Sequence, residues 1–269
     1  MLIFVENINT INKKVASALE KKDSDFFMKL IWDQLESGIV DVVDINVGSF
    51  AGEELPNMEW VVPIVEENIE GKTRISIDSS DPKTIIAGIK KLGNKEGAII
   101  NSITLEKSRH EDLIPLAKEF DLDIIGLPID ENGIPDNSTK RLELAYKLIE
   151  LIESNGIQKE NLFIDCIIEP VSVSTKNGLI ALETVAKIKE KIPEAKTFIC
   201  LTAVSFSLPE RKLLNRNFLS LLIKEGIDAI ILNPLDKEIL SNLYATRTLL
   251  DKDFYCQDYL NFIKNRNSK

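Results

Sequence analysis

The segment Arg74–Gly93, "RISIDSSDPKTIIAGIKKLG", decides the fold because it contains one complete strand–turn–helix unit. Residues 74–78 form a short apolar run with the length and β-branched content of a strand. Asp81 then has the position and chemistry of a helix N-cap, and Pro82 suits the first helical residue. The segment therefore predicts a strand followed directly by a helix, which is the repeating unit of an α/β fold.

The same unit recurs along the whole chain. We predict further strands over "LIFVE" (2–6), "DVVDIN" (41–46), "GAIINS" (97–102), "LDIIGLPI" (122–129), "LFIDCII" (162–168), "KTFICLTAV" (196–204) and "DAIILN" (228–233). Helical patterns lie between them, as over residues 138–156, where Ser138 can cap the start and Gly156 the end. This makes about eight strand–helix units.

Near-continuous apolar strands indicate a parallel sheet that is covered by helices on both faces. About eight strand–helix units in roughly 250 residues match the size of a TIM (β/α)8 barrel. A doubly wound open sheet is the alternative. The units are evenly spaced and no strand is followed by a G-x-G-x-x-G turn, which favours the barrel. With no linker or low-complexity tract, residues 1–269 are expected to form a single domain.

The composition of the chain limits the classes of partner that it is expected to bind. Lys plus Arg number 33 against 43 Asp plus Glu, and the net charge of -10 disfavours binding to nucleic acid or to anionic membranes. No apolar run approaches the length of a membrane span, and "MLIFVENINT" is too short in apolar residues for a signal peptide. Three widely spaced cysteines suggest reduced thiols. We therefore expect a cytoplasmic protein.

The predicted strands end in carboxylates and carboxamides, at Asp44, Asn46, Asp78, Asn101, Asp165 and Asn233. In a TIM barrel these ends meet at the face that carries the chemistry. Each residue alone could equally cap a helix. However, Asp78 and Asp165 lie inside apolar strands, where a carboxylate needs a partner. A neutral ligand rich in N–H donors, such as a pterin ring, would supply that partner.

Five motifs carry a resemblance to a known family: "VDINVGS", "ISIDSSDPKTIIAGIKKL", "AIINSIT", "FIDCIIEPVS" and "SLPERKLLNRNFL". In this order and spacing they resemble the methyltetrahydrofolate:corrinoid protein methyltransferases, and the resemblance extends from "ENIN" to "YCQDYL". It implies a pterin-binding barrel similar to dihydropteroate synthase. It also implies transfer of the N5 methyl group between methyltetrahydrofolate and the cobalt of a corrinoid carried by a partner protein, and a homodimer.

The resemblance also assigns roles to residues. Asp78, Asn101 and Asp165 fall on positions that hydrogen-bond the pterin ring, with Asp165 and Asn101 the candidates for a catalytic role, and Asp44 falls on an acidic position beneath the ring. Arg211 and Asn215 match polar positions in the loop after the seventh strand, near the ligand. For these two, an ordinary solvated loop role is equally consistent with the sequence.

The chain departs from the family at the seventh strand, where the usual Gly-Leu-Ser-Asn reads Cys200-Leu201-Thr202-Ala203. The missing asparagine is the one that contacts N5, so Ala203 is interpreted as a lost polar contact. Because Thr202 and Ala203 should point to opposite sides of the strand, a water or a loop hydroxyl such as Ser205 is a better substitute than Thr202.

Other differences concern metal binding and acid–base groups. Cys166 replaces a proline, Cys200 a glycine and Val5 a glycine. Two cysteines on neighbouring strands, without a third ligand nearby, do not predict a metal site. The single histidine, His110, is expected to be exposed at the start of a helix.

Two alternatives stay open. A non-catalytic pterin-binding or corrinoid-docking protein is consistent with the alanine at position 203. Dihydropteroate synthase itself is less consistent, because "NPLDKEILSNL" lacks its Ser-x-Arg-x-His motif.

Overall fold

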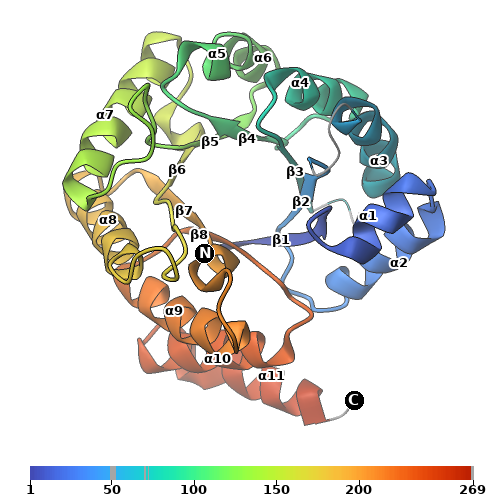
Figure 1. The fold of residues 1–269 in the computed structure, drawn as a ribbon. Coiled ribbons are helices and arrows are strands. Elements are labelled where there is room, and N and C mark those ends of the chain that lie inside the picture. Colours follow the sequence, from blue (N-terminus) through green and yellow to red (C-terminus); the bar gives the residue numbers. More distant parts are fainter. Residues whose placement is uncertain (49–52, 70, 72, 268–269) are drawn as a thin grey trace.

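The structure is a computed structural model that describes residues 1–48, 53–69, 71 and 73–267. Ser49, the last residue of the first family motif, therefore lies outside the described residues. Figure 1 shows a ring of strands surrounded by helices, seen along the axis of the ring. The described part of the chain contains no helix that is long and apolar enough to cross a membrane.

The strands close into one parallel barrel in the order β1-β2-β3-β4-β5-β6-β7-β8. This confirms the TIM barrel and excludes the open sheet. The strands are β1 (Leu2–Asn9), β2 (Val42–Asn46), β3 (Arg74–Asp78), β4 (Ile99–Ile103), β5 (Asp123–Gly126), β6 (Leu162–Asp165), β7 (Lys196–Cys200) and β8 (Ala229–Leu232).

Helices surround the barrel and cover its outer face. They are α1 (Lys13–Glu20), α2 (Ser24–Leu35), α3 (Glu54–Asn68), α4 (Pro82–Lys91), α5 (Lys107–His110), α6 (Leu113–Phe120), α7 (Ser138–Ser154), α8 (Asn177–Lys191), α9 (Arg211–Glu225), α10 (Lys237–Leu249) and α11 (Gln257–Asn267). Short 3-10 turns lie at η1 (Lys159–Asn161), η2 (Leu201–Ser205) and η3 (Phe254–Cys256). Helix α11 lies outside α10, at the edge of the ring (Figure 1).

The unit that opened the sequence analysis folds as predicted. Residues 74–78 form β3, Asp81 caps α4 by accepting a 3.2 Å hydrogen bond from the Lys83 amide, and Pro82 is the first helical residue. At α7 the cap differs from the prediction. Asn137, not Ser138, accepts the hydrogen bond from Lys140, while the Ser138 hydroxyl bonds to Glu183.

Two apolar layers hold the barrel. One fills its interior and contains Phe4, Val42, Ile99, Ile125, Phe163, Phe198, Ala229 and Ile231. The other packs the outer face of the strands against the helices. Inside the barrel, Phe4 makes edge-on contacts with Phe163 and Phe198, at centroid distances of 6.2 and 5.0 Å. The lumen beneath the site is thus a packed core, as expected for a barrel of this size.

Three predicted strands are too long at their carboxyl ends. Strand β7 ends at Cys200 rather than at residue 204. Its last pairs are Phe198 with Asp165 of β6 and Cys200 with Ile231 of β8. Without a ladder, residues 201–205 turn into η2. Strands β5 and β6 likewise end at Gly126 and Asp165. The apolar residues beyond them pack as loop residues.

Candidate functional site

Side chains on a strand alternate between its two faces, and this alternation builds a polar layer above the apolar interior of the barrel. Leu2 and Phe4 belong to the interior layer, and the next inward position on β1 is Glu6. The corresponding positions on the other strands or just after them are Asp44, Asn46, Asp78, Asn101, Asp165, Cys200 and Asn233. The carboxyl end of the barrel is therefore rich in carboxyl and carboxamide groups.

Asp44 lies deepest in this layer and is 2% exposed. The Asn101 side-chain amide on β4 donates a 3.2 Å hydrogen bond to its Oδ1 atom across β3. Burial raises the pKa of Asp44 to about 6, and the hydrogen bond from Asn101 only partly opposes this. One N–H of the Asn101 side-chain amide is therefore used in the hydrogen bond to Asp44. The Asn101 side-chain oxygen accepts no hydrogen bond from the described residues.

Asp78 occupies the next strand end. The Asn46 amide donates a 2.7 Å hydrogen bond to its Oδ2 atom. Burial, and then the neighbouring carboxyl of Asp44, raise the pKa of Asp78 well above its ordinary value. A carboxyl in this setting keeps its proton to a higher pH than an exposed aspartate does, and in its protonated form it can donate a hydrogen bond as well as accept one.

Asp165 ends β6, and its Oδ1 atom accepts a 2.7 Å hydrogen bond from the Ile167 amide. Burial raises the pKa of Asp165 to about 7; the Ile167 amide and the Arg141 guanidinium oppose the shift, and Asp78 adds to it. The pKa values of Asp44, Asp78 and Asp165 are thus linked through space. Together the three carboxyls and Asn101 can accept hydrogen bonds from a flat, N–H-rich ligand and exchange protons with it.

Glu6 belongs to the same layer, and the sequence analysis missed it as a site residue. Its Oε2 atom accepts a 2.8 Å hydrogen bond from the Thr202 hydroxyl. Burial raises the pKa of Glu6, while Thr202 and Arg211 partly oppose the shift. The signal was available, because Leu2, Phe4 and Glu6 are spaced two apart and must share one face of a strand.

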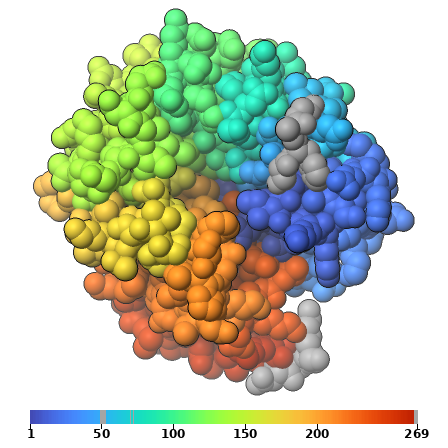
Figure 2. All heavy atoms as spheres, viewed as in Figure 1, coloured from blue at the N-terminus to red at the C-terminus, as the bar shows by residue number. Residues whose placement is uncertain are grey.

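A cavity of about 690 Å³ opens at the mouth beside β1, β7 and β8. Its lining includes Glu6, Cys200, Thr202, Ala203, Arg211 and Asn215. Figure 2 shows this hollow where the blue N-terminal segment meets the yellow and orange segments. The predicted site residues therefore divide between two places: Arg211 and Asn215 line the cavity, whereas Asp44, Asp78, Asn101 and Asp165 lie at the strand ends beside it.

Arg211 and Asn215 were expected in the loop after the seventh strand, but they lie in the first turns of α9. The Arg211 guanidinium donates to the Thr202 carbonyl at 2.8 Å and to the Ser205 hydroxyl at 3.1 Å, so it holds the η2 turn. Asn215 is 8% exposed, and its side-chain oxygen has no hydrogen-bond partner among the described residues. A buried amide oxygen without a donor is free to receive one from a ligand.

Ala203 lies on η2 rather than on a strand, so the expectation that Thr202 and Ala203 point to opposite sides is wrong. Both residues line the cavity. Of the two substitutes expected, the Ser205 hydroxyl is buried and bonded to the Thr202 carbonyl and to Arg211, while the water stays a prediction. Thr202, which was disfavoured, instead contacts an acid in the site.

The two cysteines at these strand ends lie on opposite faces of the barrel wall. Cys166 packs in the layer between strands and helices, and Cys200 packs against the interior layer. Burial raises the pKa of both thiols well above the ordinary value. Among the described residues, no group of three His, Cys, Asp or Glu side chains has the spacing of a metal site.

His110 differs from the prediction. It ends α5 rather than starting a helix, it is half-buried, and its Nδ1 atom lies 3.0 Å from the Thr104 carbonyl oxygen.

The chain is similar in sequence and in fold to known proteins. Residues 5–233 match the sequence profile of the family described as "Pterin binding enzyme". The chain is 29% identical over 261 residues to a methylcorrinoid:tetrahydrofolate methyltransferase of Eubacterium limosum, covering 96% of this chain and 94% of that protein. It is 30% identical over 171 residues to the methionine synthase of Mycobacterium leprae, a match that covers 59% of this chain but 14% of that enzyme.

Among solved structures, a Yersinia pestis DHPS with a pterine-sulfa conjugate superposes with a TM-score of 0.67, at 16% identity and 93% coverage of this chain and 94% of that chain. The crystal structure of the Yersinia pestis dihydropteroate synthase superposes with a TM-score of 0.62, at 16% identity and 93% coverage of both chains. At this level of identity the likeness shows the fold alone.

Proposed function

The chain belongs to the pterin-binding enzyme family, and from this premise we propose that it transfers a methyl group between the N5 atom of tetrahydrofolate and the cobalt of a corrinoid carried by a partner protein. The observation that carries the proposal is the layer of three carboxyls and one carboxamide at the strand ends, in which Asp44 is buried and Asp78 and Asp165 are half-buried. Burial raises the pKa of Asp44 to about 6 and that of Asp165 to about 7. The similarity to the Eubacterium limosum methyltransferase over nearly the whole chain supports the same reaction.

The layer fits a pterin ring. The 2-amino group and N3–H of the ring form a parallel pair of donors, which one carboxylate can accept. Asp165 has one oxygen on the Ile167 amide and the other without a described protein donor. Asn101 can read a neighbouring ring position with its free oxygen, because its amide is already bound to Asp44. Asp78, on the neighbouring strand end, would contact a third position of the ring.

The reaction needs a proton at N5. When the methyl group moves from cobalt to tetrahydrofolate, the N5 lone pair forms the new N–CH3 bond, the cobalt–carbon electron pair stays on cobalt, and the N5 proton must leave. In the opposite direction, N5 must be protonated or hydrogen-bonded as the methyl group departs. Both directions are assisted by a group near N5 that can hold and return a proton.

Glu6 supplies such a group in the part of the cavity that contains Ala203. Burial raises the pKa of Glu6, so its carboxyl can hold and return a proton, and the Thr202 hydroxyl fixes one of its oxygens at 2.8 Å. We propose that this pair performs the function of the asparagine that Ala203 replaces. Cobalt chemistry is supplied by the corrinoid on the partner, so a nucleophilic side chain of this chain is not required.

The cavity has room for a substrate. Its volume of about 690 Å³ lies within the range of about 300–1,000 Å³ for small-molecule sites. We propose that the part of the mouth around Ala203, Arg211 and Asn215 receives N5 and the approaching corrinoid, while the strand ends hold the pterin edge. A corrinoid protein is thus the proposed partner, and a homodimer remains a prediction that analytical ultracentrifugation can test.

The test uses the purified chain with tetrahydrofolate and methylcobalamin as the free methyl donor, followed by the change in corrinoid absorbance. We expect methyl transfer in the wild type and a marked loss in Asp165→Asn. Asp123→Asn is the matched control, because Asp123 sits at the amino end of β5 and pairs with Arg74 away from the mouth. Folate binding without transfer to or from any corrinoid donor would instead favour a non-catalytic pterin-binding protein, the reading that Ala203 left open.

A further inference from the structure

The Arg141 side chain is charged but lies in the protein interior, where an uncompensated charge costs free energy. It lies in the first turn of α7, is 1% exposed, and has the largest volume of the fully buried side chains. Burying a guanidinium costs free energy unless its N–H groups find acceptors, and a cation near a helix N-terminus opposes the helix dipole. The position therefore requires a compensating role.

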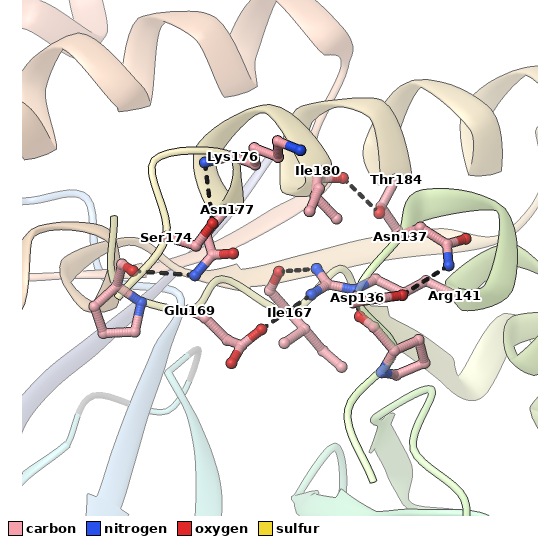
Figure 3. Close-up of polar contacts among 12 residues, drawn as sticks. Asp136, Asn137, Arg141, Ile167, Glu169, Ser174, Lys176, Asn177, Ile180 and Thr184 are labelled. Atoms are coloured by element: carbon pink, nitrogen blue, oxygen red, sulfur yellow. Dashed lines mark hydrogen bonds and ion pairs between the residues drawn. The ribbon is translucent and has the colours of Figure 1, made fainter. Parts of the chain in front are cut away.

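The acceptors of Arg141 are main-chain carbonyls, two of them in the loop after β6 and one just before α7. Its Nη1 atom donates to the Cys166 oxygen at 3.0 Å and to the Ile167 oxygen at 2.5 Å, and its Nε atom donates to Pro135 at 3.0 Å. Its Nη2 atom lies 3.6 Å from Glu169. Figure 3 shows the side chain extending from α7 to Ile167 and Glu169. The guanidinium therefore donates hydrogen bonds to the main chain of both residues that follow Asp165.

Ile167 needs such support. Its φ angle is 49°, in the left-handed region, where a β-branched residue is strongly disfavoured. Conformations of this kind persist only where the surroundings fix them. In this conformation the Ile167 amide points back at β6 and donates its 2.7 Å hydrogen bond to Asp165 Oδ1. The same residue therefore accepts from Arg141 and donates to Asp165.

The charged and titratable groups around Asp165 make Arg141 important for its ionisation as well. Arg141 opposes the pKa increase that burial causes in Asp165, whereas Asp78 adds to it. The neighbouring thiols are neutral at physiological pH, since burial raises their pKa values. The groups that face Asp165 come from four elements or their loops: Arg141 of α7, Asp78 of β3, Cys166 after β6 and Cys200 of β7.

We propose that Arg141 is a positioning residue for pterin recognition: it locks the Cys166–Ile167 turn, so that the Ile167 amide holds one oxygen of the Asp165 carboxylate and leaves the other for the ligand. The identity of the ligand rests on the proposed function. The contact between Arg141 and the turn does not, because it is made within the chain.

The first experiment follows Asp165 directly and needs no ligand. Aspartate labelled with carbon-13 at the side-chain carboxyl is incorporated, the Asp165 resonance is assigned by its absence in Asp165→Asn, and its titration is followed by NMR from pH 5 to 9. We expect Arg141→Met, which removes the charge at similar length, to move the Asp165 midpoint to higher pH. Arg141→Lys keeps the charge and should leave the midpoint nearer to that of the wild type.

Arg74→Met is the matched control. Arg74 also donates to a main-chain carbonyl, that of Gly97 at 2.6 Å, and pairs with Asp123, but it stands at the amino end of β3. Its replacement removes a half-buried arginine of the same chemistry from the opposite end of the barrel. It should lower stability without moving the Asp165 midpoint, which separates a local role from general loosening.

The second experiment measures tetrahydrofolate binding by titration calorimetry across the same pH range. Arg141→Met should bind about tenfold more weakly at pH 7, a loss of about 1.4 kcal/mol, and should recover part of that affinity as Asp165 ionises at higher pH. Arg141→Lys should bind weakly at every pH, because one ammonium nitrogen cannot replace both Nη1, which holds the turn, and Nε, which holds Pro135.

An Arg141→Met protein that folds, yet titrates at Asp165 like the wild type, overturns the proposal. If Arg141→Met fails to fold, the comparison moves to an Ile167→Gly background, where glycine adopts the turn without steric cost. Equal Asp165 midpoints in Ile167→Gly and in the double variant overturn it equally. A shifted midpoint in a chain that binds no tetrahydrofolate would leave the positioning role standing and reject the proposed ligand.

Discussion

The Thr202 hydroxyl donates a 2.8 Å hydrogen bond to the Glu6 carboxyl and so joins the turn after β7 to the end of β1. The two residues are separated by most of the chain and by strand β8, which lies between β7 and β1 in the barrel. Their contact places a half-buried acid, whose pKa burial raises, on the cavity that Ala203 also lines.

Glu6→Gln should slow methyl transfer with little change in folate affinity. The amide keeps the size of the side chain and a contact with Thr202 but cannot exchange a proton. Loss of a group that acts mainly in the transition state lowers turnover by about 10²–10³. Single-turnover transfer from methylcobalamin, measured beside calorimetric tetrahydrofolate binding, checks both parts. Equal turnover in the variant and the wild type would remove Glu6 from the mechanism.

Ala203→Asn tests the same idea from the other side. In wild-type background, an asparagine beside an intact Glu6 should change turnover little, because the role is already filled. In the Glu6→Gln background it should restore turnover by about tenfold, or about 1.4 kcal/mol. A gain of tenfold in the wild-type background would show instead that position 203 is an uncompensated loss.

Asp165→Asn should weaken tetrahydrofolate binding by about 1–3 kcal/mol, because a neutral amide is a weaker acceptor than a carboxylate and presents an NH2 group in place of one oxygen. Titration calorimetry at pH 8, where Asp165 is mostly ionised, gives the cleanest comparison. Asp123→Asn, at the other end of the barrel, should bind like the wild type. If the Asp165 variant also binds normally, Asp165 does not contact the ligand.

The ligand-free protein should lose stability as the pH rises from about 4 to about 7. Burial raises the folded-state pKa of Asp165 from 3.8 to about 7. Such a group contributes stability that is fully present below the unfolded pKa and is lost as the pH rises through the folded pKa. Each pKa unit corresponds to about 1.4 kcal/mol.

Asp165→Asn removes this ionisation, so it should be more stable than the wild type at pH 8, by about 1 kcal/mol or more. The advantage should shrink towards pH 5. Urea unfolding at several pH values measures the difference, and the comparison of the two proteins cancels other titrating groups. A constant gap across this range would mean that the pKa of Asp165 is not raised.

Phe4→Ala should destabilise the barrel by about 3–5 kcal/mol. Phe4 is fully buried and contacts both Phe163 and Phe198 in the interior beneath the site. The measurement is urea unfolding. A loss below about 1 kcal/mol would indicate that the interior repacks around the cavity.

The sequence determined the barrel. Strand length, apolar content and helix start signals repeat about eight times, and these are local properties that survive in any arrangement of the units. Residues 74–93 fold as predicted, including the Asp81 N-cap and Pro82 as the first helical residue. The polar residues at the strand ends could be predicted for the same reason. Side chains on a strand alternate between its two faces, so the sequence alone shows which of them point inward.

Only the tertiary structure decided where the strands end and what meets there. Strand β7 ends at Cys200, where its pairing with β6 and β8 stops, and that pairing is a property of the closed barrel. The turn that results brings Thr202 to Glu6, and the grip of Arg141 holds Ile167 against Asp165. These contacts join residues far apart in the chain, and the burial that raises the pKa of each acid exists only once the barrel has closed around it.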